Sequence, residues 1–123
     1  MMSELRSDDP VVFDAAVVSS LTGDDEDAEF ARVFVGRFQR MLPERLRRID
    51  VALAEQDITD AMDAVLSLKS ASGTVGAGEL FVIGSVVEAH LRRRDFDAAT
   101  RAAGDLPAAA VRADRAITAY LGA

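Results

Sequence analysis

Apolar residues recur at helical spacing along most of the chain. Near the start, Phe13, Val17 and Leu21 follow one another at intervals of four residues, before a break at Thr22-Gly23. This spacing predicts a short helix, and Asp14 is a suitable N-cap for it. Glycine after the last apolar position is typical of a helix C-terminus.

The second predicted helix is the longest. Its apolar positions, three or four residues apart, are Phe30, Phe34, Phe38, Met41, Leu42, Leu46, Ile49 and Leu53. We expect it to reach about Gln56, with a kink or a new first turn near Met41 and Leu42, because Pro43 removes a helical hydrogen bond. The acidic run 24–29 lacks the alternate spacing and central glycine of a calcium-binding loop, and carboxylates stabilise helix N-termini. We interpret it as part of the helix start.

Three more apolar periods follow. The first begins at Asp57 and ends at Gly73 or Gly76, and its apolar face comprises Ile58, Ala61, Val65, Leu68 and Ser72. The second begins beside Gly78 and ends in the basic run 92–94, and its inward positions are Leu80, Ile83, Val87 and Leu91. The last runs over residues 96–120 and crosses Gly104, Asp105 and Pro107. It therefore predicts two collinear helices or one kinked helix.

These elements predict an all-α fold. Short connections make sequence neighbours into spatial neighbours, which favours an antiparallel four-helix bundle with a short additional N-terminal helix. A chain of 123 residues suits one hydrophobic core. We expect one domain over residues 10–123, preceded by a flexible N-terminus of residues 1–9.

Composition narrows the possible functions. The chain has no cysteine, which excludes disulfides and thiolate metal sites, and it lacks an apolar stretch that could span a bilayer. Its net charge of −7 disfavours nucleic acid and anionic membranes. With one histidine and no phosphate-binding glycine loop, we expect no enzyme, no metal and no cofactor. A cytoplasmic protein with protein partners is the expectation.

Residues 64–77 read AVLSLKSASGTVGA, which resembles AHxLKGxSxxxGA, the signature of histidine phosphotransfer (Hpt) domains. Leu68-Lys69 and Gly76-Ala77 match the corresponding pairs. The resemblance extends over about residues 12–121 and implies the same helical bundle. It departs from the family pattern at Gln56, where the family usually has glycine before Asp57, and at Val87 and Arg94 within VVEAHLRRRDFDAA.

The resemblance also implies where the family's chemistry would lie. It places Leu66 at the position of the phospho-accepting histidine and Ser70 at a position where the family favours glycine. Lys69 matches a family lysine that can neutralise phosphoryl oxygens. Leucine has no lone pair with which to attack phosphorus, so the relay chemistry is not carried over.

The residues around Leu66 allow two interpretations each. At about 100° per residue, Leu66 falls at the edge of the apolar face, so it is either a boundary core residue or an exposed contact residue beside Met62. Lys69 is either a solubilising surface residue or a partner for an anion. His90, the only histidine, lies off the motif. A structural role suits it better than that of a substitute phospho-acceptor.

The leading hypothesis is a pseudo-Hpt module that binds a receiver domain or a sensor histidine kinase without carrying phosphate. Its partner-binding residues would be Met62, Leu66, Lys69 and Ser70. One alternative is an active phosphotransfer protein that uses His90. Another is a structural helical bundle that self-associates through its last helix. We expect a monomer or a weak homodimer.

Overall fold

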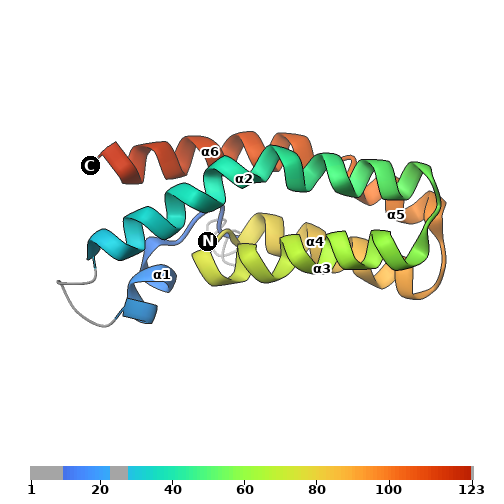
Figure 1. Ribbon diagram of the computed structural model, residues 1–123, viewed down its shortest axis with the longest axis horizontal. Helices are drawn as coiled ribbons and strands as arrows, with labels where there is room; N and C mark the ends of the chain where they lie inside the picture. Colours follow the sequence, from blue (N-terminus) through green and yellow to red (C-terminus); the bar gives the residue numbers. More distant parts are fainter. Residues whose placement is uncertain (1–9, 23–27, 123) are drawn as a thin grey trace, which may run out of the picture.

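The computed structural model describes residues 10–22 and 28–122, and these form six α-helices (Figure 1). Their bounds are α1 Ala15–Thr22, α2 Ala28–Ala54, α3 Ile58–Val75, α4 Gly78–Arg92, α5 Phe96–Ala103 and α6 Leu106–Gly122. The described residues contain no strand. The all-α prediction is therefore confirmed.

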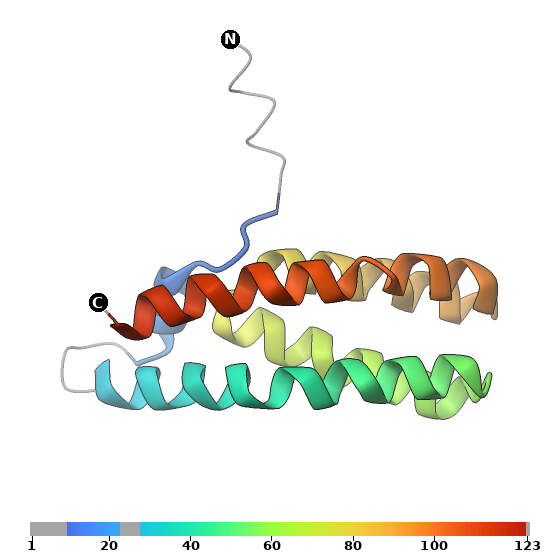
Figure 2. The same cartoon turned by 90° about the horizontal axis from the view of Figure 1, so that it is seen from above.

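Four columns of helix make up the bundle. Figure 1 shows α2 and α6 along one edge and α3 and α4 along the other, and Figure 2 shows α2 beside α3 and α4 beside α5 and α6. Helices α5 and α6 lie end to end as one column with a break at Gly104-Asp105. The short helix α1 lies at the end of the bundle where α6 finishes. The predicted antiparallel four-helix bundle with an extra N-terminal helix is confirmed.

Helix ends follow the capping chemistry expected from the sequence. The Asp57 carboxylate accepts a hydrogen bond of 3.0 Å from the backbone N–H of Asp60 and so begins α3. Gly76 ends α3 in the left-handed conformation at φ 86°. The Asp14 carboxylate accepts a 3.0 Å bond from the N–H of Ala16 at the start of α1. These three ends lie where the pattern predicted them.

Helix α2 is continuous through Pro43, so of the two alternatives predicted there a new first turn does not occur. Its end at Ala54 lies close to the predicted end near Gln56. Phe30 and Met41, which continue the apolar period of α2, are 65% and 44% exposed. The other helices cover only one side of α2. The apolar positions of α2, three and four residues apart, spread over a wider part of the helix surface than that side.

The core lies between the four columns. Its largest fully buried side chains come from every column and from α1, and they are Val18, Val35, Ile49, Val65, Leu68, Val75, Leu80, Val87, Leu91, Leu106 and Ile117. Helix α6 buries Leu106, Ala109, Ala113 and Ile117. The alanines on its inward face leave little space between the helices and let α6 pack closely.

Residues 10–14 cross the end of the bundle beside the start of α4. The N–H of Asp14 donates to the carbonyl of Gly76 over 2.9 Å, and the N–H of Glu79 donates to the carbonyl of Val11 over 2.8 Å. A Cβ at Gly76 would lie 2.4 Å from the Asp14 carbonyl oxygen, and one at Gly78 would lie 2.7 Å from that of Val11. The two glycines therefore allow this segment to dock.

Two expectations fall outside the described residues. These are the flexible N-terminus of residues 1–9 and the acidic run up to Asp27. Within residues 10–22 and 28–122, every helix is too short or too polar to span a lipid bilayer.

Candidate functional site

The outward face of α3 holds all four predicted partner-binding residues. Met62, Leu66, Lys69 and Ser70 are spaced by three or four positions, and this spacing aligns them along one side of the helix. The opposite side of α3 is buried in the core through Ala61, Ala64, Val65, Leu68 and Ser72. Fixed caps at both ends of α3 set which side faces outward.

Leu66 lies in the middle of this face. It is 37% exposed, although its neighbour Val65 and the nearby Leu68 are fully buried. Ser70, one turn later, is exposed, and Met62, one turn earlier, is half-buried. Of the two interpretations of Leu66, the structure supports the exposed one, and a polar substitution there can still reach water.

Lys69 is not free to meet an anion. Its ammonium donates a 2.7 Å hydrogen bond to Glu88 Oε1 on α4 and lies 5.4 Å from the centre of the Phe81 ring. Arg92 donates to the other carboxylate oxygen of Glu88, its Nε over 3.0 Å. A charged triad of Lys69, Glu88 and Arg92 therefore ties α3 to α4.

Glu88 is the charged residue at the centre of this triad. It is 8% exposed, and a carboxylate so placed is favourable only if it is paired. The hydrogen bond from Lys69, followed by that from Arg92, lowers the pKa of Glu88 below its usual value and outweighs the effect of burial. Glu88 stays ionised at neutral pH and neutralises the lysine.

Sequence reasoning missed this triad. Glu88 and Arg92 belong to the stretch that resembles the Hpt pattern, but Lys69 lies 19 residues before Glu88 in the chain. The contact depends on how α4 packs against α3. The i, i+4 spacing of Glu88 and Arg92 could have predicted their ion pair, but not the contact of Glu88 with Lys69.

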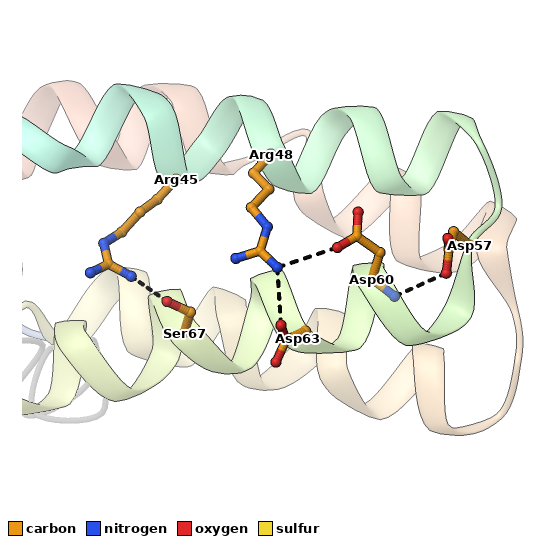
Figure 3. A network of polar contacts seen from close by, with 6 residues as sticks. All are labelled: Arg45, Arg48, Asp57, Asp60, Asp63 and Ser67. Atoms are coloured by element: carbon orange, nitrogen blue, oxygen red, sulfur yellow. Dashed lines mark hydrogen bonds and ion pairs between the residues drawn. The ribbon is translucent and has the colours of Figure 1, made fainter.

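A second polar network joins α2 to α3 (Figure 3). Arg48 donates to Asp60 over 3.2 Å and to Asp63 over 3.0 Å. One turn earlier on α2, Arg45 donates through Nη1 to the hydroxyl of Ser67. Figure 3 shows both arginines reaching from α2 down to α3. Ser67 follows Leu66 in sequence, but its side chain lies about 100° around α3 from that of Leu66, on the side that meets α2.

His90 is placed apart from the α3 face. It is half-buried in the last turn of α4, and its imidazole forms no hydrogen bond or ion pair with another residue of the described chain. No third residue orients it as a nucleophile would require. Within the described ranges, no three His, Asp or Glu side chains come together as a metal site would need.

The Hpt domain family matches residues 33–119, and the chain belongs to this family. Hpt domains are phosphotransfer modules of phosphorelay signalling that interact with receiver domains and kinases, and they are not classical catalytic enzymes.

A solved structure supports the same fold. The crystal structure of histidine-containing phosphotransfer protein B (HptB) from Pseudomonas aeruginosa PAO1 is similar with a TM-score of 0.75 and 21% sequence identity. The similarity covers 90% of this chain and 95% of that one. A search of curated proteins found no match.

Proposed function

We propose that this Hpt domain binds a receiver domain or a sensor histidine kinase through the α3 face of Met62, Leu66, Lys69 and Ser70, and that it does not carry phosphate itself. The observation that carries the proposal is the exposure of Leu66 at the centre of the face, and the sequence resemblance implies that this is the position of the family's histidine. The proposal includes a cytoplasmic location, which is typical of Hpt domains.

The chemistry of the side chains on this face supports the proposal that the domain does not carry phosphate. A phosphorelay needs an imidazole nitrogen that attacks phosphorus, and the hydrocarbon side chain of Leu66 has no such atom. The lysine one turn away already neutralises Glu88 at 2.7 Å. Neither a nucleophile nor a free cation is therefore present on this side of the face.

Binding without transfer has a physical basis in the same residues. Leu66 is 37% exposed, so burying the rest of its side chain in an interface would stabilise the complex by about 0.5 to 1 kcal/mol before ordering costs. The half-buried Met62 beside it extends the apolar centre. Polar Ser70 at the edge matches the polar rim that surrounds the apolar core of many interfaces.

The test is a titration against receiver domains and kinases from the same organism, with Leu66→Asp as the diagnostic variant. We expect Leu66→Asp to abolish binding while the thermal midpoint stays near that of the wild type. In the free protein the carboxylate reaches water, but in a complex it would be desolvated at a cost of about 2 kcal/mol or more.

Val111→Asp is the matched control, because Val111 is a 49% exposed apolar residue on α6, away from α3. It should leave affinity unchanged. A stable Leu66→Asp protein that binds as well as the wild type would contradict the proposed face. A complete lack of binding across the panel would contradict the proposed function.

A further inference from the structure

A small groove lies between α2 and α3, and its wall on α3 consists of Ala71 and Val75, which follow Ser70 along the helix. Its volume is about 140 Å³, and its lining residues are Phe34, Arg37, Phe38, Met41, Arg45, Ala71 and Val75. We refer to these residues as the α2–α3 groove. Its walls are mostly apolar, and its two polar lining side chains are both arginines. A site of this kind suits a ligand with a short apolar stem and a negative end.

Arg45 has an unused donor edge in this groove. Its Nη1 donates to Ser67, but its Nε is buried and has no hydrogen-bond partner in the described structure. Figure 3 shows the rest of the guanidinium pointing away from Ser67. A buried donor without an acceptor is unfavourable, and such groups in folded proteins usually have a reason. Here the missing partner would be an oxygen acceptor beside Nε and Nη2.

The same structure shows how this edge binds a carboxylate. In Arg112, Nε donates to Glu79 Oε1 over 3.0 Å and Nη2 donates to Oε2 over 2.8 Å. Such a two-bond arrangement is the preferred way in which arginine holds a carboxylate. The same edge of Arg45 meets no carboxylate among the described residues, but its Nε is buried, so a partner's carboxylate would reach Nη2 first.

Some arginines of α2 are paired with carboxylates, and others are not. Arg47 is paired with Glu44, and Arg48 with Asp60 and Asp63. Arg37 and Arg45 form no ion pair with any residue in the described ranges. No described carboxylate therefore balances the positive charge of the groove. The groove is therefore complementary to an acidic side chain.

We propose that the α2–α3 groove receives a glutamate side chain from the partner, with Arg45 and Arg37 holding its carboxylate and the apolar walls contacting its methylenes. This inference rests on the proposed function, because the glutamate would come from the partner that is proposed to bind the α3 face. It extends the binding face from α3 onto α2 and gives the partner a defined chemistry, an acidic residue next to an apolar contact.

Acetate is the probe for the groove itself, and it needs no partner. The Arg Nε–H signals of the ¹⁵N-labelled protein are followed during titration with sodium acetate at constant ionic strength, with chloride as the reference. We expect the Arg45 signal to shift and saturate, and Arg37→Gln to weaken this response severalfold. The Arg112 signal, already bonded to Glu79, should stay fixed. An Arg45 signal that does not respond to acetate overturns the proposal.

Partner binding is then measured with Arg37→Gln, Arg45→Gln and the control Arg101→Gln, an exposed arginine on α5. Each groove variant should weaken binding about tenfold or more, and the control should not. Arg37 is exposed, so Arg37→Gln tests the groove even if Arg45→Gln fails to fold.

The results separate the two proposals. Binding that depends on Leu66 but not on Arg37 or Arg45 overturns the glutamate site and leaves the proposed function standing. If no receiver or kinase binds the wild type, the proposed function fails and the acetate titration alone decides the groove: saturation at Arg45 supports it, and no response overturns it.

Discussion

Leu66 and Lys69 lie one helical turn apart on α3, and their surroundings determine what this face can do. Leu66 is open to solvent, whereas the Lys69 ammonium is held between Glu88 and the Phe81 ring. A phosphoryl group placed at residue 66 would have to compete with Glu88 for the lysine. In the proposed register, the absence of a nucleophile at residue 66 would be the first obstacle to phosphotransfer, and the occupied lysine the second.

We predict that Leu66→His gains partial phosphoryl acceptance from a receiver that binds the wild type, and that adding Ser70→Gly increases it. An imidazole at this exposed position supplies the nucleophile, and glycine removes a side chain that limits close approach. Acid-labile label on the protein is the measurement. Leu66→Gln, which has no nucleophile, is the control. A folded double variant that binds the receiver and stays unlabelled would show that the motif register is wrong.

Glu88 gives the bundle a defined acid sensitivity. Its pKa is lowered by Lys69 and then Arg92, so its stabilising effect is present above the unfolded-state pKa of about 4.3. This contribution is lost as pH falls through the lower, folded-state value. Stability therefore falls on acidification, because the unfolded chain binds the proton first.

We predict that Glu88→Gln lowers the free energy of unfolding by about 1 to 2 kcal/mol at pH 7 and has much less effect at pH 3. Urea denaturation at the two pH values measures the difference. Glu44→Gln is the control, since Glu44 pairs with Arg47 on the open surface of α2 and should matter little at either pH. An equal loss at both pH values would assign Glu88 a packing role alone.

At the scale of elements, polar ties join neighbouring helices across the bundle. Arg48 joins α2 to α3, Lys69 joins α3 to α4, and Arg112 joins α6 to α4. Gln39 on α2 donates to Asp114 Oδ1 and Thr118 Oγ1 on α6, both over 2.9 Å. These contacts specify which polar edges align, while the apolar core supplies most of the stability.

Two connections of the bundle carry backbone strain. Gln56 and Arg94 adopt the left-handed conformation, with φ of 55° and 57°. These are two of the positions at which the chain departs from the family pattern, and the family usually has glycine there. A side chain in this conformation costs about 1 to 2 kcal/mol.

We predict that Gln56→Gly and Arg94→Gly each raise the free energy of unfolding by about 0.5 to 1 kcal/mol, the relief of strain being partly offset by greater freedom of the unfolded chain. Gly76→Ala is the opposite test. Its positive φ and the 2.4 Å approach to the Asp14 carbonyl should make it clearly destabilising. Thermal denaturation of the three variants checks the signs, and destabilisation by either added glycine would contradict the strain argument.

Much of the fold could be predicted because its signals are local. Caps at Asp57 and Gly76 and the break near Gly104 depend on residues within a turn of each other, and these boundaries were confirmed. The exposure of Phe30 and Met41 could not be predicted, because it depends on how much of α2 the other helices cover. Helix periodicity identifies an apolar face, but it does not tell how much of that face the other helices cover.

The candidate site divides in the same way. The motif register located Leu66 and its neighbours, and helical geometry placed them at the edge of the apolar face. Glu88 as the partner of Lys69, and Ser67 as the partner of Arg45, join residues 19 and 22 positions apart on different helices. Such contacts follow from the packing of α3 against α4 and α2, which no spacing within one helix reveals.

For the whole molecule, charge is unevenly distributed. Residues 1–9 contribute −2 and residues 23–27 contribute −4 to the net charge of −7, so the rest of the chain is close to neutral at −1. Helix α2 alone has six arginines and three acidic residues. The acidity that disfavours nucleic acid therefore comes mainly from two segments, and the α2 side of the bundle suits an acidic protein partner.

Membership of the Hpt family establishes the bundle over residues 33–119, but phosphoryl transfer depends on a single side chain. The whole chain has one histidine, His90, which is half-buried on α4 without an orienting partner among the described residues. We predict that the wild-type protein accepts no phosphoryl group from any phosphorylated receiver, including one that binds it. The measurement is acid-labile label after incubation with phosphorylated receivers, and an active Hpt domain serves as the positive control.

Because the chain has only one histidine, a single variant, His90→Ala, tells whether a label on the wild type is carried by histidine. Label that is retained on the wild type and lost in His90→Ala would make His90 the acceptor and replace the proposed binding module with an active phosphotransfer protein.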